Sequence, residues 1–153
     1  MSSNITRFEI FSIEEVFNLV EKYVNWHKSY KMYIILHHMK VNLTSDRYST
    51  FMRSGTVCKE CGLEGKYFAL EISDRDMSNR GTAHFNLYGI NYLGQEILMT
   101  KDHIVPRCEG GKNNIRNYQT LCTLCNSKKG LIEGIRFNLI KDAATLSESY
   151  AVI

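Results

Sequence analysis

Residues 101–130 read KDHIVPRCEGGKNNIRNYQTLCTLCNSKKG, and this stretch decides the fold of the chain's second half. It holds an Asp-His pair, the single proline of the chain, paired glycines, several asparagines and a Cys-x-x-Cys. A histidine side chain can take up a proton near neutral pH, and a carboxylate is a ligand that Mg²⁺ prefers. The stretch therefore indicates a site for metal-assisted hydrolysis.

The length and composition of the whole chain limit the classes of protein to which it can belong. Its 153 residues suffice for one domain, and 44% hydrophobic with 23% charged residues is ordinary for a soluble globular protein. It has no run of about 18 apolar residues, and its N-terminus lacks a basic start followed by an apolar segment. We therefore expect a cytoplasmic protein with no membrane partner. Disulfides are rare in that compartment, so the five cysteines are expected to be metal ligands or free thiols.

Positive charge is concentrated around the quoted stretch. Residues 101–141 carry eight basic and three acidic side chains, whereas residues 1–100 carry eleven of each. A local basic field favours a polyanion such as nucleic acid as the partner, although an unevenly charged, solvated surface would give the same count.

The first third of the chain is predicted to be helical. Residues 11–26 repeat apolar side chains at helical spacing, and Ser12 with Glu15 forms a capping box at their start. Residues 30–39 could continue this helix or form a second element. Thr44 or Ser45 could cap a further short helix that ends before Gly55.

The pattern changes after residue 55. Residues 84–104 indicate two strands separated by a turn near Gly89–Gly94, and residues 117–129 indicate a strand that gives way to a helix running towards Leu139. We predict one α+β protein with a helical N-terminal arm (1–55), a second region that holds the site (56–141) and a C-terminal tail (142–153).

Four cysteines form two matched pairs. Cys58 and Cys61 make one Cys-x-x-Cys, and Cys122 and Cys125 make another. Each such turn places two thiolates on one side of a tight loop, so two turns complete a four-sulfur site of the kind that holds structural zinc. Redox-active pairs are the main alternative. Cys108 is assigned no role.

The quoted stretch resembles the HNH endonuclease family. The resemblance rests on Asp102-His103 with Pro106, on Asn117, and on Cys122-x-x-Cys125-Asn126 with Lys129. It is specific over residues 99–130 and extends more loosely back to Cys58. It implies a ββα-metal core, which consists of two antiparallel strands, the loop between them and a helix packed across, stabilised here by the four-cysteine zinc site.

The resemblance also implies a role for each site residue. His103 would be the general base, Asp102 and Asn126 would hold a catalytic divalent ion, and Asn117 would brace the loop and help to orient the histidine. Asn126 stands where the family name has its last histidine. Because an amide is a poorer ligand than imidazole for transition metals, this H-N-N form favours Mg²⁺ or Mn²⁺.

DNA is the expected substrate, and four basic side chains are candidates for phosphate contacts, namely Arg107, Lys112, Lys128 and Lys129. The small size resembles nucleases of phages or mobile elements. A homodimer remains open, because one motif cuts one strand. Two other functions also remain open, a zinc-stabilised nucleic-acid-binding module without catalysis and a thiol redox protein.

Overall fold

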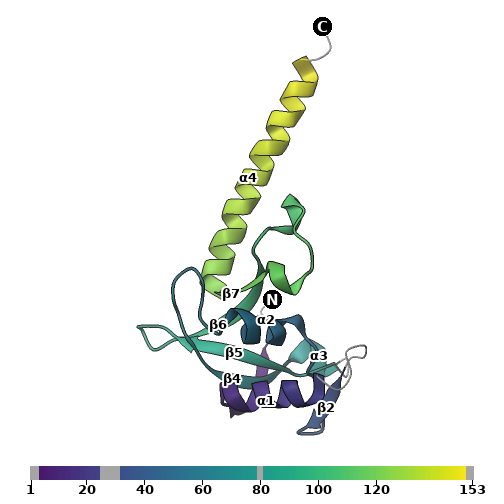
Figure 1. The fold of residues 1–153 in the computed structure, drawn as a ribbon, viewed down its shortest axis with the longest axis vertical. Helices are drawn as coiled ribbons and strands as arrows, with labels where there is room; N and C mark the ends of the chain where they lie inside the picture. Colours follow the sequence, from purple (N-terminus) through teal and green to yellow (C-terminus); the bar gives the residue numbers. More distant parts are fainter. Residues whose placement is uncertain (1–3, 25–31, 79–80, 151–153) are drawn as a thin grey trace.

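The computed structural model describes residues 4–24, 32–78 and 81–150, with side chains up to residue 141. Its centre is a five-stranded antiparallel sheet in the order β1-β4-β5-β6-β7 (Figure 1). The strands are β1 (Ile5–Phe11), β4 (Gly65–Ser73), β5 (His84–Ile90), β6 (Glu96–His103) and β7 (Tyr118–Cys122). A separate two-stranded hairpin joins β2 (Tyr33–Leu36) to β3 (Met39–Asn42).

The helices differ greatly in length. They are α1 (Ile13–Val24), α2 (Asp46–Ser54), α3 (Asp74–Ser78) and α4 (Thr123–Tyr150), and the loop between β6 and β7 adds the 3-10 turns η1 (Arg107–Glu109) and η2 (Ile115–Asn117). The last helix has 28 residues, leaves the sheet and extends well beyond the rest of the chain (Figure 1). Among the described residues, no helix combines the length and the hydropathy that a membrane crossing needs.

Two helices cover one face of the sheet and build the core with it. The rings of Phe17 on α1 and Phe51 on α2 both lie against Phe68 on β4, with centroids 5.9 and 6.1 Å away. Tyr48 on α2 is fully buried in the same layer, and its hydroxyl oxygen accepts a hydrogen bond from the backbone N–H of Phe85. The core therefore fastens the N-terminal helices to the central strands.

The N-terminal region is not the helical arm that the sequence predicted. Strand β1 pairs with β4 as an edge of the main sheet, and residues 33–36 and 39–42 form a hairpin. The predicted helix is present with its capping box, because Ser12 and Glu15 each accept a hydrogen bond from the other's backbone N–H. Its predicted end at residue 26, and residues 30 and 31, lie outside the described residues.

The predicted elements of the second half are confirmed. Strands β5 and β6 are antiparallel and joined by a turn, and β7 leads directly into α4. The short helix α2 lies between Ser45 and Gly55, as predicted. Helix α4 continues beyond Leu139 and through residue 142, where the sequence predicted the beginning of a tail.

A buried carboxylate ties β1 to the sheet, and it gives a first prediction. Glu71 on β4 is almost fully buried, and it accepts hydrogen bonds from Arg7 at 2.8 Å, from Asn86 at 2.7 Å and from Tyr88 at 2.9 Å. Replacing Arg7 with alanine leaves this charge without its cation. We expect the free energy of unfolding to fall by about 2 kcal/mol. The loss is smaller than for a buried ion without any hydrogen-bond partner, because Asn86 and Tyr88 still donate to Glu71.

Urea unfolding measures this loss, and Lys66→Ala is the matched control. Lys66 pairs with Glu64 at 2.7 Å, but both side chains are more than half exposed, so removing the pair should change stability by less than about 1 kcal/mol. Equal effects of the two substitutions would contradict a structural role for the Arg7–Glu71 pair.

Candidate functional site

The four paired cysteines come together although 60 residues separate the two pairs in the sequence. Their sulfur atoms all lie within 4.8 Å of one another, so Cys58, Cys61, Cys122 and Cys125 are positioned to hold a metal ion. Cys58 and Cys122 are buried, whereas Cys61 is exposed. Four thiol donors around one point are the ligand set of a closed tetrahedral site.

Local backbone geometry presents these thiols. The turn after Cys58 closes with a hydrogen bond from the Gly62 N–H to the Cys58 carbonyl, and Gly62 takes a positive φ of 75° that a residue with a side chain adopts less readily. Cys122 ends β7 and Cys125 lies in the first turn of α4. The cluster therefore links the loop that precedes β4 to the start of the long helix.

Burial and hydrogen bonds shift the pKa values of the clustered thiols in different directions. Burial opposes the charged form of Cys58, but the backbone N–H groups of Cys122, Cys61 and Glu60 lower its pKa to about 7. Burial and the neighbouring thiols raise the pKa of Cys122 and of Cys125. A bound cation reverses such increases, because it stabilises the thiolates that repel one another without it.

The second cluster lies where β6 runs beneath the start of α4. Asp102 accepts a hydrogen bond from Gln119 on β7 at 2.9 Å and one from Lys129 on α4 at 2.6 Å. Thr100 lies two residues before Asp102 on β6, on the same face of the strand, and accepts a hydrogen bond from Asn126 at 3.1 Å. The structure thus places Asp102 and Asn126 on the side of β6 that α4 covers.

Lys129 is held inside this cluster. Besides Asp102, its ammonium group donates to the backbone carbonyl of His103 and lies 3.2 Å from Glu133 one turn further along α4. Partial burial opposes its charge, but the carboxylates of Asp102 and Glu133 together raise the pKa of Lys129. Lys129 is therefore a cation bound to the carboxylate that the sequence assigned to a metal.

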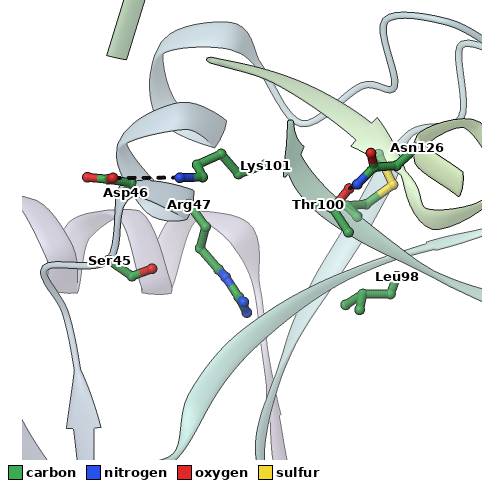
Figure 2. A pocket seen from close by; sticks show the side chains of 8 residues that line it. Ser45, Asp46, Arg47, Leu98, Thr100, Lys101 and Asn126 are labelled. Atoms are coloured by element: carbon green, nitrogen blue, oxygen red, sulfur yellow. Dashed lines mark hydrogen bonds and ion pairs between the residues drawn. The ribbon is translucent and has the colours of Figure 1, made fainter. Parts of the chain in front are cut away.

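A cavity of about 400 Å³ opens beside Asn126 (Figure 2). The pairing of β6 with β5 extends only to Leu98, and the cavity lies between residues 98–101 of β6 and residues 45–47 at the start of α2. Lys101 and Arg47 line it, and Lys101 lies 3.6 Å from Asp46, as Figure 2 shows. The lining of the cavity therefore includes two cationic side chains, Lys101 and Arg47, with the carboxylate of Asp46 beside Lys101.

His103 is the last residue of β6 and projects to the opposite face from Asp102. Its ring meets the Tyr118 ring edge to face, with centroids 4.9 Å apart. Its Nε2 lies 2.9 Å from Asn113 Oδ1. An amide oxygen only accepts, so this contact is a hydrogen bond in the tautomer that carries its proton on Nε2, and that tautomer has Nδ1 unprotonated.

Asn117 holds the loop between β6 and β7 in shape. Its side-chain carbonyl accepts from the Val105 N–H, and its amide donates to the carbonyls of Val105 and Lys112 at 3.1 Å each. Gly111 lies so close to Val105 that an added Cβ would come within 1.8 Å of the Val105 carbonyl oxygen. The loop fold thus depends on Asn117 and on a glycine at position 111.

The four basic side chains that the sequence predicted as phosphate contacts differ in their solvent exposure. Arg107, Lys112 and Lys128 are exposed, as phosphate contacts must be, whereas Lys129 is half-buried and paired as described above. Cys108 is exposed in the loop and lies outside the cysteine cluster.

Sequence reasoning missed three residues that shape the site. Asn113 orients the histidine, Gln119 and Glu133 complete the surroundings of Asp102 and Lys129, and none belongs to the motif that was recognised. The only signal for Glu133 was its spacing of four residues from Lys129 on a predicted helix.

Comparison with known proteins gives two matches for this chain. Residues 94–132 match the family described as HNH endonuclease, which confirms the resemblance for this segment. A curated mouse (Mus musculus) protein, the DNA annealing helicase and endonuclease ZRANB3, is 30% identical over 95 residues, which cover 54% of this chain and 9% of that protein. No solved structure gives a significant match. Together the two matches support nuclease activity in general.

Proposed function

We propose that the chain is a metal-dependent endonuclease that hydrolyses DNA phosphodiester bonds. The observation that carries the proposal is the arrangement at the end of β6, within the segment that matches HNH endonucleases. Asp102 and Asn126 lie on the side of the strand that α4 covers, and His103, its last residue, projects from the other side, so a phosphate would reach both around the end of the strand. In this proposal β6, β7 and the start of α4 are the ββα-metal core.

The donor set suits a hard cation. Asp102 offers a carboxylate and Asn126 an amide oxygen, and these are the ligands that Mg²⁺ or Mn²⁺ takes together with water and phosphate oxygens. When bound there, such an ion would neutralise the scissile phosphate and the leaving oxygen. The four cysteines, by contrast, suit zinc, which we propose as a structural ion that fixes the helix start from which Asn126 projects.

His103 would supply the base. Its Nδ1 would take the proton of the attacking water, while Asn113 holds the ring by Nε2 and Tyr118 packs against it. Lys101 and Arg47 beside Asn126, together with the exposed Arg107, Lys112 and Lys128, would attract and hold the phosphate backbone. Nicking would then leave a 5′-phosphate and a 3′-hydroxyl.

The test is a plasmid assay. Purified protein should convert supercoiled plasmid to the nicked form when Mg²⁺ or Mn²⁺ is present and should leave it intact when a chelator removes these ions. Cleavage that is insensitive to the chelator, or no cleavage with either ion, would refute the proposal.

A nucleic-acid-binding module without catalysis is the second candidate. The pairing of Asp102 with Lys129 favours it, because a carboxylate that is already neutralised needs no metal ion. Binding of duplex DNA that weakens steeply with salt, without cleavage under any divalent ion, would support this function instead.

The same pairing gives a prediction about metal affinity. A divalent ion at Asp102 must displace the Lys129 ammonium or bind next to it, and like charges repel at that distance. Lys129→Met removes the charge but keeps a side chain of similar length. We expect its dissociation constant for Mn²⁺ to fall about tenfold, as measured by isothermal titration calorimetry on the zinc-loaded protein.

Lys128→Met is the control for this measurement, because Lys128 is adjacent but exposed. It should leave Mn²⁺ affinity close to that of the wild type. Weaker Mn²⁺ binding by Lys129→Met would show instead that Lys129 orients Asp102 and does not compete with the ion.

A further inference from the structure

Lys129 neutralises the carboxylate to which the proposed function assigns a metal ion. Its ammonium nitrogen lies 2.6 Å from Asp102 Oδ2, and Gln119 donates a hydrogen bond to the same oxygen at 2.9 Å. The side chains of Lys129 and Asp102 are only 24% and 13% exposed, so water and salt screen this pair less than they screen a surface ion pair. In the protein without DNA, a divalent ion at Asp102 therefore has to compete with a cation that is already in place.

Asp102 and the two cavities beside it carry balanced charges without an ion. One cavity adjoins Asn126 and the other, of about 310 Å³, adjoins Lys129. Together with Asp102 they present four acidic and four basic side chains, namely Asp46, Glu60, Asp102 and Glu133, and Arg47, Lys101, Lys128 and Lys129. A divalent ion alone would leave an excess of two positive charges, and two phosphates of a DNA backbone would cancel it. The ion and the DNA therefore favour each other's binding.

Lys129 has space to move away from Asp102. It lines the cavity of about 310 Å³ together with Lys128, Gln119 and Glu133. Glu133 Oε1 already lies 3.2 Å from the ammonium nitrogen, one turn further along α4. Lys129 can therefore release Asp102 and stay paired with a carboxylate, so the movement does not leave a half-buried charge without a partner.

A phosphate that shares an ion with Asp102 comes within reach of the same ammonium group. Oxygen ligands lie about 2.1 Å from Mg²⁺, so two ligands of one ion are about 3–4 Å apart. Lys129 can then exchange the Asp102 carboxylate for a phosphate oxygen, because a lysine forms charge-assisted hydrogen bonds of the same kind with both groups.

We propose that Lys129 couples metal binding at Asp102 to DNA binding. Without DNA, Lys129 holds Asp102 and keeps the affinity for Mg²⁺ or Mn²⁺ low. With DNA, it pairs with a backbone phosphate and frees Asp102 for the ion. This inference rests on the proposed function, because it takes Asp102 as a ligand of the ion, and it adds that the ion enters the site together with DNA.

The coupling has an expected size. Without DNA, Lys129→Met should bind Mn²⁺ about tenfold more tightly than the protein with Lys129 does, whereas with DNA bound the two should have similar Mn²⁺ affinities. DNA should therefore raise the Mn²⁺ affinity about tenfold more when Lys129 is present. By linkage, saturating Mn²⁺ should raise the DNA affinity of the two proteins in the same ratio.

Fluorescence anisotropy of a labelled DNA duplex measures this ratio without any use of cleavage. Each zinc-loaded protein is titrated with and without saturating Mn²⁺, in a His103→Ala background that leaves the DNA intact during the titration. The substitution keeps the backbone carbonyl of residue 103, to which Lys129 also donates. Asp102→Ala in this background gives the baseline, because it shows how Mn²⁺ changes DNA binding without the proposed ligand.

Three further variants are the matched controls. Lys128→Met removes an exposed lysine that lines the same cavity, so it should weaken DNA binding but leave the response to Mn²⁺ unchanged. Lys129→Arg keeps the positive charge and should keep most of the coupling. Lys129→Gln is a second neutral variant and should behave like Lys129→Met. Circular dichroism and zinc content show whether each protein is folded.

Two results would overturn the coupling alone. One is a response to Mn²⁺ that is no larger with Lys129 than with methionine or glutamine at that position. The other is a response that Lys128→Met reduces as much as Lys129→Met does. A parent protein that responds to Mn²⁺ no more than Asp102→Ala has a different meaning, because no ion then binds at Asp102 and the proposed metal site fails together with the coupling.

Discussion

Cys58→Ser is expected to remove the metal ion from the four-cysteine cluster and to unfold the protein at room temperature. Structural zinc in a site of this type contributes about 10–16 kcal/mol of binding free energy, and a domain of this size is stable by only about 5–15 kcal/mol. Cys58 is buried and accepts a hydrogen bond from the Cys122 N–H at 3.3 Å, so the substitution also loosens the end of β7. Loss of this one ligand should therefore exceed the stability of the fold.

Metal analysis by mass spectrometry and thermal unfolding check this expectation. The wild type should hold about one zinc ion per chain, because four cysteines complete one tetrahedral site. Cys108→Ser is the matched control, since Cys108 is exposed and lies outside the cluster. It should keep both the zinc and the melting temperature. A folded Cys58→Ser protein with a full complement of metal would show that the cluster is not the metal site.

The features that the sequence predicted well depend on neighbouring residues. The capping box at Ser12 and Glu15, the β5–β6 hairpin and the step from β7 into α4 all follow from patterns within a few positions. The cysteine cluster is the exception, because its halves are far apart. It was still predictable, since a tetrahedral ion needs four ligands and two matched pairs supply them.

The features that the sequence missed depend on contacts between distant segments. Strand β1 was not predicted because its pairing with β4 joins positions 57 to 68 residues apart, and such pairing leaves little trace in the sequence of an edge strand. The bond between Lys129 and Asp102 depends on how α4 is rotated against β6. The hydrogen bond between Asn113 and His103 depends on the conformation of the loop that joins β6 to β7. No local pattern determines either of them.

His103→Ala is expected to separate DNA cleavage from DNA binding. A general base acts only in the transition state, so its loss should lower the cleavage rate by about 10²–10⁴-fold and leave affinity for DNA nearly unchanged. His103 ends a strand and is only half-buried, and the substitution touches none of the four cysteines. The protein should therefore remain folded and keep its zinc.

Two further variants distinguish this role from the alternatives. Asn113→Ala frees the ring that Asn113 holds by Nε2, so it should slow cleavage by less than His103→Ala does, because the base is still present but less well oriented. Asp102→Ala should also stop cleavage, but by removing a proposed metal ligand. Excess Mn²⁺ should then restore part of the activity of Asp102→Ala and none of that of His103→Ala.

The decisive comparison measures plasmid nicking and DNA binding for all three variants, each checked for folding and zinc content. If the order is His103→Ala slowest, Asn113→Ala intermediate and Asp102→Ala rescued by Mn²⁺, the residues act as proposed. A folded His103→Ala protein that nicks at the wild-type rate would mean that His103 is not the base. In that case the ion pair between Lys129 and Asp102 would favour the second candidate function. A carboxylate that is neutralised within the protein fits a nucleic-acid-binding module better than a metal-dependent nuclease.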